Sequence, residues 1–362
     1  MNCIHFTNEE KYIKDFIKLP GKLYSKADNM EDAQDMKALL KGEHPLSGYF
    51  KLYPFLVYDN RQVVGRFGIT VYPNDTTAYL GFYECADRDE VAKMIFEEAE
   101  NFAGELGCER IEGPVDASFW IKYRLKINLF DRLPYTGEPY NKEYYLKQFT
   151  DNGFCVSQHY TSNFYEPLAA ENEDPLYDNR LAMFTEKGYE IESPNIKDYD
   201  VILGQLYKLL TELYSDFPIY KDLSESDFRK VFDNYRYILN LTMVKMAYYK
   251  GEPVGFLVSV PDYGNRVYHL KNPFNLLTVL KLKKKPKQYV MLYMGVDQSH
   301  RGLGKALAGS IMEELRKNGL PSIGALARDG KITQKYGEDY IEQLYEYVLL
   351  EKNVTKIYKR EG

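Results

Sequence analysis

The chain has few of the residues that cross-link a fold or bind a metal. It has 362 residues, among them four cysteines and five histidines. The cysteines are scattered (Cys3, Cys85, Cys108 and Cys155), and no Cys-x-x-Cys or His-x-x-x-His pair occurs. Zinc sites and disulfide frameworks usually show such spacings. The sequence therefore predicts no metal site, no disulfide framework and a reducing compartment.

The chain also has no long apolar run and no excess of positive charge. No run approaches the roughly 20 apolar residues that a helix needs to cross a bilayer. The first residues, MNCIHFTNEEKYIKDF, are mixed and charged, unlike a secretory signal. The net charge of −6 disfavours binding along a nucleic acid. We therefore expect a cytoplasmic protein with no membrane span and no nucleic-acid partner.

One stretch combines a strand, a glycine-bearing turn and a helix. The run Tyr289 to Val296 is apolar and β-favouring, as in a strand that is covered on both faces. The turn Arg301-Gly302-Leu303-Gly304-Lys305-Ala306 follows. After the turn, one apolar helix stripe repeats every four residues, at Leu303, Leu307, Ile311 and Leu315.

This turn has the features of an anion site. The first N–H groups of a helix are unpaired within it and carry partial positive charge. Glycine lets a phosphate approach the backbone, and Arg301 and Lys305 add fixed charge. A tight turn before a well-packed helix is the alternative. The P-loop signature is absent, and Leu307 stands where the dinucleotide fingerprint needs its third glycine.

Arg301, Gly304 and Ala306 match the pattern Gln/Arg-x-x-Gly-x-Gly/Ala. The stretch therefore resembles the acyl-CoA pyrophosphate loop of the GNAT N-acetyltransferase superfamily. The resemblance implies that acetyl-CoA or another acyl-CoA is a co-substrate and that no metal takes part. It also implies the binding residues: Met294, Val296, Arg301, Gly302, Leu303, Gly304, Lys305 and Ala306.

The same order of elements occurs twice along the chain. Val64-Gly65 corresponds to Val254-Gly255, and the strands at Tyr79 and Arg110 correspond to those at Tyr289 and Ser322. An inserted loop at 261–288 accounts for the larger offset of the later pairs. Each half, a helix, a hairpin and then β-α-β-α-β, has the element order of the GNAT fold. A single α+β domain with coincidental alternation is the alternative.

We therefore expect an α+β (α/β layered) fold, a tandem of two GNAT-like domains, each with a mixed central sheet flanked by helices. The predicted parts are a degenerate GNAT-like domain without a CoA loop (1–165), an acidic, proline-bearing linker (166–182) and a GNAT acyltransferase domain (183–362). The chain as a whole resembles uncharacterised bacterial tandem GNAT proteins.

Tyr345 is the candidate catalytic residue. It lies in Gln343-Leu344-Tyr345-Glu346, within a helix predicted from Tyr340 to Glu351. This segment resembles the Leu-Tyr-Glu segment of GNAT enzymes, which implies that the Tyr345 hydroxyl protonates the leaving thiolate of CoA. In a chain with 34 tyrosines, Tyr345 as a core residue is the alternative. A last strand is expected from Thr355 to Lys359.

The first half lacks these features. Asp87-Arg88-Asp89-Glu90-Val91-Ala92 stands in place of the loop, without glycine and with three carboxylates that would repel a pyrophosphate. Phe149 takes the place of the tyrosine. We expect this half to keep the fold and to have lost CoA binding. It either shapes the acceptor site or acts only as a scaffold.

The leading functional hypothesis is transfer of an acetyl group from acetyl-CoA to a primary amine of a small molecule or amino acid. Transfer of a longer acyl chain, from acyl-CoA or an acyl carrier protein, is one alternative. A non-catalytic acyl-CoA-binding regulatory protein is another. No general base is assigned. The lysines at 281–287 form a solvated loop, or a patch for an acyl carrier protein or the CoA 3′-phosphate.

Overall fold

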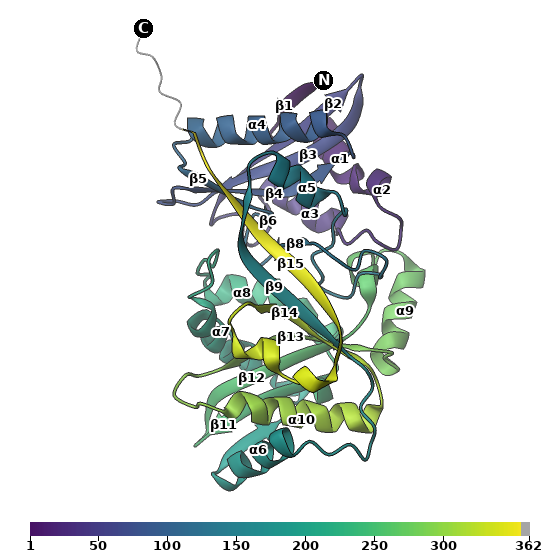
Figure 1. The fold of residues 1–362 in the computed structure, drawn as a ribbon, viewed down its shortest axis with the longest axis vertical. Coiled ribbons are helices and arrows are strands. Elements are labelled where there is room, and N and C mark those ends of the chain that lie inside the picture. Colours follow the sequence, from purple (N-terminus) through teal and green to yellow (C-terminus); the bar gives the residue numbers. More distant parts are fainter. Residues whose placement is uncertain (356–362) are drawn as a thin grey trace. The chain divides into compact units, whose positions relative to one another are not determined.

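The computed structural model describes residues 1–355, whose helices and strands form two compact units (Figure 1). The first unit comprises Met1–Pro134, Pro139–His159 and the chain from Glu346 onward. The second comprises Tyr135–Glu138 and Tyr160–Tyr345. Strands β9 (Cys155–Tyr165) and β15 (Ile341–Asn353) each contribute residues to both units. Among the described residues, no helix is long and apolar enough to span a bilayer.

The first unit is built on a sheet with the strand order β1-β2-β3-β4-β5-β15. Its other elements, in chain order, are β1 (Asn2–His5), α1 (Glu10–Lys18), α2 (Pro20–Leu23), α3 (Ala33–Lys41), β2 (Lys51–Asp59), β3 (Gln62–Val71), β4 (Thr77–Cys85), α4 (Asp89–Glu105), β5 (Arg110–Gly113), β6 (Val115–Asp116), β7 (Lys122–Tyr123), β8 (Leu125–Lys126) and α5 (Tyr145–Asp151).

Helix α4 and the central strands supply the core of this unit. The α4 residues Val91, Ile95 and Ala99 recur every four positions, and all three are buried. They pack in one cluster with Phe55 and Phe67 of the β2–β3 hairpin. All nine residues of β4 are buried, as expected for a strand covered on both faces.

The second unit has a sheet with the strand order β9-β14-β13-β12-β11-β10. Its remaining longer elements are α6 (Pro175–Glu186), β10 (Tyr189–Glu192), α7 (Tyr199–Tyr214), α8 (Glu225–Phe232), β11 (Val244–Tyr249), β12 (Glu252–Pro261), α9 (Pro273–Lys284), β13 (Tyr289–Val296), α10 (Leu303–Asn318) and β14 (Ser322–Arg328). The 3₁₀ turns are η1 (Ile196–Asp198), η2 (Asp233–Tyr237), η3 (Leu241–Met243), η4 (Gly264–Tyr268), η5 (Ile332–Lys335) and η6 (Glu338–Tyr340).

Helices cover both faces of this second sheet. On β13, Met294 packs with Leu303 and Ala306 of α10. The neighbouring Tyr293 lines an apolar pocket together with Leu203 of α7. Because successive strand residues point to opposite faces, α10 and α7 lie on opposite sides of the sheet.

The predicted internal repeat is present in the strand pairing. In the first unit, Thr77–Tyr79 pair in parallel with Arg110–Glu112. In the second unit, Tyr289–Met291 pair in parallel with Ser322–Gly324, and the paired residues are separated by the same number of positions along the chain as in the first unit. Both parallel ladders are three residues long. The predicted α+β layered fold, with mixed sheet structure flanked by helices, is therefore confirmed.

The helix predicted from Tyr340 to Glu351 is wrong, because residues 341–353 form strand β15. Leu350–Asn353 pair with β5, and Tyr347 and Val348 pair with β8. Leu, Glu and Lys favour helix in isolation, but tertiary pairing overrides such weak preferences. The strand expected at Thr355–Lys359 falls outside the described residues, apart from Thr355, which is not in a strand.

The division into units also differs from the predicted boundaries. Glu346 onward, expected in the second domain, groups with the first unit because β15 pairs with β5 there. Tyr160–Tyr165 groups with the second unit, where β9 pairs with β14. The expected linker at 166–182 includes the start of α6. Asp174 caps that helix by accepting from the Leu176 N–H at 3.0 Å, and Pro175 opens it.

Gly81 should be one of the least replaceable residues of the first unit. A Cβ at this position would lie 1.9 Å from the Val115 carbonyl oxygen, so only glycine allows β4 and β6 to approach. We expect Gly81→Ala to lower the free energy of unfolding by about 3 kcal/mol or more. Urea denaturation of this variant, compared with Gly48→Ala, where a Cβ meets nothing within 4 Å, measures the difference. Equal midpoints for the two variants would contradict the close approach.

Candidate functional site

A short turn connects β13 to α10 and sets where the helix begins. The Asp297 carboxylate accepts hydrogen bonds from the Ser299 N–H at 2.8 Å and the Ser299 hydroxyl at 2.6 Å. These bonds lower the pKa of Asp297, and the ionised carboxylate stabilises the turn. The His300 N–H closes the same turn on the Asp297 carbonyl at 2.9 Å. Asp297 and His300 are therefore structural parts of the loop.

The first turn of α10 is open to a ligand. Gly302 is its N-cap, with φ +92°, a conformation that glycine adopts without strain. Among the described residues, no side chain caps this helix. The helix therefore presents backbone N–H groups and the positive end of its dipole without a protein anion to neutralise them.

Three cationic side chains surround this helix start. Arg301 is exposed and Lys305 is half-buried, both on the loop itself. The third, Arg180, comes from α6, and its Nη1 atom would lie 3.4 Å from a Cβ on Gly302. Sequence reasoning missed Arg180 because the acidic composition around it indicated a linker. Helix α6 is held in place by Arg316 of α10, whose guanidinium contacts the Asp178 carboxylate at 2.9 and 3.1 Å.

A tyrosine hydroxyl lies directly over the same turn. A Cβ on Gly304 would lie 2.3 Å from the Tyr336 hydroxyl oxygen, so glycine is required for this approach. The Met294 Cε atom would lie 3.5 Å from the same Cβ. Burial raises the pKa of Tyr336 to about 12, with a smaller contribution from Tyr177. Tyr336 therefore stays protonated at neutral pH and can donate a proton or a hydrogen bond.

Hydrogen bonds from two neighbouring elements hold Tyr336 there. The Tyr165 hydroxyl of β9 donates to the Tyr336 carbonyl at 2.6 Å. The Gly337 N–H donates to the Tyr177 hydroxyl of α6 at 2.7 Å. Asn163 donates to the Gln334 carbonyl at 2.9 Å. The segment between β14 and β15 is therefore fixed over α10 although it contains only short 3₁₀ turns.

The predicted binding residues fall into three groups. Arg301, Gly302, Gly304 and Lys305 lie at the open helix start, and Met294 borders it. Leu303 and Ala306 are buried and pack with Leu307, so their side chains serve the core, and only their backbone can serve a ligand. Val296 is half-buried and pairs with Gly255 of β12.

Tyr345, predicted as the proton donor, lies in strand β15. Its side chain is 5% exposed, and its ring packs edge-on against Tyr135, with 5.7 Å between ring centroids. The sequence does not identify Tyr336, because the residues around it in the chain give no sign that its side chain lies over Gly304.

The corresponding turn of the first unit is differently built. Helix α4 begins after Arg88, whose guanidinium contacts the carboxylates of Asp59 at 2.9 Å and Glu90 at 2.8 Å. Asp89 and Glu90 occupy the first turn. Negative side chains therefore complement the dipole of α4, whereas the first turn of α10 has no acidic residue.

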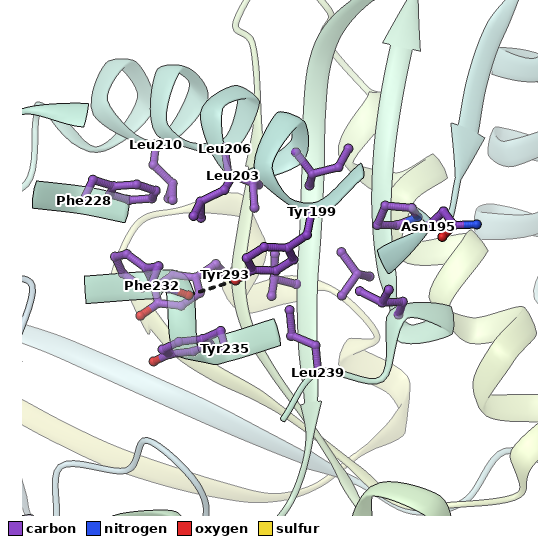
Figure 2. Close-up of a pocket in the computed structure, with 15 residues that line it drawn as sticks. Asn195, Tyr199, Leu203, Leu206, Leu210, Phe228, Phe232, Tyr235, Leu239 and Tyr293 are labelled. Atoms are coloured by element: carbon purple, nitrogen blue, oxygen red, sulfur yellow. Dashed lines mark hydrogen bonds between the residues drawn. The ribbon is translucent and has the colours of Figure 1, made fainter. Parts of the chain in front are cut away.

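An apolar pocket lies on the face of the second sheet opposite α10. Figure 2 shows aromatic and leucine side chains from α7, α8 and η2 pointing into it, with Tyr293 from β13. The cavity measures about 40 Å³. It can hold a small apolar group, since a cavity of roughly 150 Å³ is needed to bind benzene.

A wider crevice of about 490 Å³ lies between the chain after β9 and the start of β15. Four carboxylates line it: Glu166, Glu171, Asp339 and Glu342. Like charges would repel a diphosphate from this crevice. The start of α10 is therefore better suited to an anion than this crevice is.

Comparison with known proteins gives a consistent picture. Residues 205–333 match the profile of the acetyltransferase (GNAT) family. No curated protein matches the chain.

Three solved structures illustrate the likeness in fold. A tandem GNAT protein from the clavulanic acid biosynthesis pathway is 12% identical with a TM-score of 0.57, over 99% of each chain. A GCN5-related N-acetyltransferase from Sphaerobacter thermophilus is 10% identical with a TM-score of 0.51, over 97% of this chain and 96% of that chain. A glucosamine N-acetyltransferase region of a fungal multi-domain β-N-acetylglucosaminidase is 12% identical with a TM-score of 0.55, over 97% of this chain and 38% of that chain. At such identities the likeness concerns the fold.

The role of Arg180 can be tested with a simple anion. We expect Arg180→Gln to weaken the binding of inorganic pyrophosphate up to about 5-fold, because one charge at a helix N-terminus contributes up to about 1 kcal/mol. Isothermal titration calorimetry measures the change. The exposed Lys208 of α7 provides the control, as Lys208→Gln removes one charge of the same sign from the same unit. Equal losses in both variants would show a general charge effect and contradict a site at Gly302.

Proposed function

We propose that this chain, a member of the GNAT superfamily, uses its second unit to bind an acyl-CoA and to transfer the acyl group to an amine. The simplest donor is acetyl-CoA, and the acceptor is the primary amine of a small molecule or amino acid. One observation carries the proposal, the open start of α10 at Gly302 with Arg180, Arg301 and Lys305 around it.

The donor would be held mainly through its pyrophosphate. Backbone N–H groups at the helix start, those of Gly302 and Gly304 first, would donate hydrogen bonds to the phosphate oxygens, whereas Leu303 and Lys305 already donate to the His300 and Gly302 carbonyls. The three cations would balance the charge of the diphosphate. Met294 borders the same glycine and offers an apolar contact for the arm that leads from the phosphates to the thioester.

The transfer needs a proton donor for the leaving thiolate. The amine nitrogen attacks the thioester carbon, the C–S bond breaks as the amide forms, the thiolate takes a proton from a phenol, and the nitrogen loses a proton that can restore the phenol. Tyr345 is the candidate donor, on the strength of its sequence context. Tyr336 lies over Gly304, at the phosphate end of the site, so its protonated phenol would donate a hydrogen bond to a phosphate oxygen.

Two alternatives make different demands on the structure. A long acyl chain needs an extended apolar cavity beside the thioester, whereas an acetyl group does not. A non-catalytic acyl-CoA-binding protein would need the anion site but no proton donor, so turnover separates it from an enzyme.

The first unit would not bind the donor. The start of α4 carries Asp89 and Glu90 and has no glycine, so a diphosphate would meet negative charge there. We propose that this unit serves the architecture or the acceptor.

Donor binding can be tested by replacing the glycine under Tyr336. We expect Gly304→Glu to reduce acetyl-CoA affinity at least about 100-fold, because the new side chain would fill the approach to the helix start and add a negative charge. Calorimetry with acetyl-CoA measures it, and circular dichroism verifies the fold. Gly21→Glu, at an exposed glycine with nothing within 4 Å, is the control. Undiminished affinity in Gly304→Glu would place the donor elsewhere.

Tyr336 and Tyr345 can be separated by turnover. We expect Tyr345→Phe to lower kcat at least about 100-fold with little change in acetyl-CoA affinity, because a general acid contributes to the chemical step, and Tyr336→Phe to weaken acetyl-CoA binding instead. Thiol release over a panel of primary amines measures it. Tyr237→Phe, at a 65% exposed tyrosine, is the control. Loss of kcat in Tyr336→Phe but not in Tyr345→Phe would reverse the assignment. Binding of acetyl-CoA without turnover on any amine would favour the regulatory protein.

A further inference from the structure

Helix α9 of the second unit turns large apolar side chains outward. Four of them are well exposed, Phe274 at 76%, Leu276 at 43%, Leu277 at 64% and Leu280 at 49%. Only Val279 of this helix is buried. A helix that is apolar on both its inner and outer sides normally has both sides covered. The outward side of α9 is thus an exposed apolar patch, which marks an interaction site.

The same helix ends in a dense group of lysines. Lys281, Lys284, Lys285 and Lys287 are exposed. The 34 residues from Tyr263 to Val296 contain seven Lys or Arg and no Asp or Glu. In a chain with a net charge of −6, this is a marked local reversal of sign. Whatever covers the patch should therefore be both apolar and negatively charged.

Contacts within the unit hold α9 in this orientation. Asn272 caps the helix by accepting from the Phe274 N–H at 3.0 Å, and Pro273 opens it. At the other end, the Lys283 ammonium donates to the Tyr237 carbonyl at 2.7 Å. Tyr237, whose ring is exposed, is therefore hydrogen-bonded to the lysine end of α9. An aromatic ring with a polar tip is typical of groups at a membrane surface.

We propose that the outward side of α9 docks on an anionic lipid bilayer. Phe274, Leu277 and Leu280 would enter the boundary between headgroups and acyl chains, and the exposed lysines would meet the lipid phosphates. The helix would lie in the surface and would not span it. The proposal stands apart from acyl transfer and needs no property of the α10 site.

The composition of the patch favours a bilayer over a protein. Lysine is depleted at the centres of protein interfaces, and leucine is rare among the residues that dominate their binding energy. Aliphatic side chains beside clustered lysines are what surface-lying membrane helices carry. A second copy of this chain is disfavoured, because a symmetric contact through α9 would bring two sets of lysines together.

Vesicle co-sedimentation of the full chain tests the proposal. We expect binding to vesicles of phosphatidylcholine with phosphatidylglycerol, weak or no binding to phosphatidylcholine alone, and a loss as salt screens the charges. Replacing Lys281, Lys284, Lys285 and Lys287 by Gln should weaken binding at least about 100-fold, since each lysine near such a surface adds about a factor of five. The pair Leu277→Asp and Leu280→Asp should weaken it even at low salt.

Fluorescence reports insertion directly. The chain has one tryptophan, Trp120, which is buried. We expect Leu280→Trp to show a blue shift with phosphatidylglycerol vesicles. Leu176→Trp should show none, although Leu176 of α6 is as exposed (50%) as Leu280.

Three results would overturn the proposal. One is the absence of binding to phosphatidylglycerol vesicles. Another is binding that persists in the Leu277→Asp, Leu280→Asp variant, which would reflect charge alone. The third is an acyl carrier protein that binds through the same lysines while vesicles do not, which would make the patch a protein-docking surface.

Discussion

The approach of the Tyr336 hydroxyl to the Gly304 backbone is the contact on which the account of the second unit depends. A Cβ at residue 304 would remove it. The turn before it requires a second glycine, because Gly302 has φ +92° and stands beside Arg180. The structure therefore requires glycine at both Gly302 and Gly304, and both lie at the start of α10. There, backbone N–H groups, three cations and a protonated phenol lie together without a capping carboxylate among the described residues.

The two units show how one arrangement of strands and helices can be open in one copy and closed in the other. Both pair two parallel strands over three residues. In the first unit, Gly81 lets Val115 approach β4, and the Asp116 carboxylate accepts from the Phe82 N–H. The chain itself thus fills the place beside the strand. In the second unit, Met294 of β13 borders the open helix start.

Much of this is predictable from the sequence, because β13 and the turn before α10 carry strong local signals. The strand Tyr289–Val296 has the predicted bounds. Arg180 and Tyr336 were not predictable, since each reaches the site only through tertiary contacts with Gly302 and Gly304. Strand β15 was mistaken for a helix because its Leu, Glu and Lys residues favour helix until β5 and β8 pair with it.

Two parts of the second unit, the start of α10 and helix α9, differ in local composition. The start of α10 is suited to a small anion, whereas α9 combines exposed leucines with exposed lysines. The central claim is that the α10 site holds the donor. A crystal structure of the full chain with acetyl-CoA tests it most directly. We predict the pyrophosphate within hydrogen-bonding distance of the backbone N–H groups of Gly302 and Gly304, with Arg180 beside it. A pyrophosphate at the start of α4, or acetyl-CoA bound away from α10, would contradict the account.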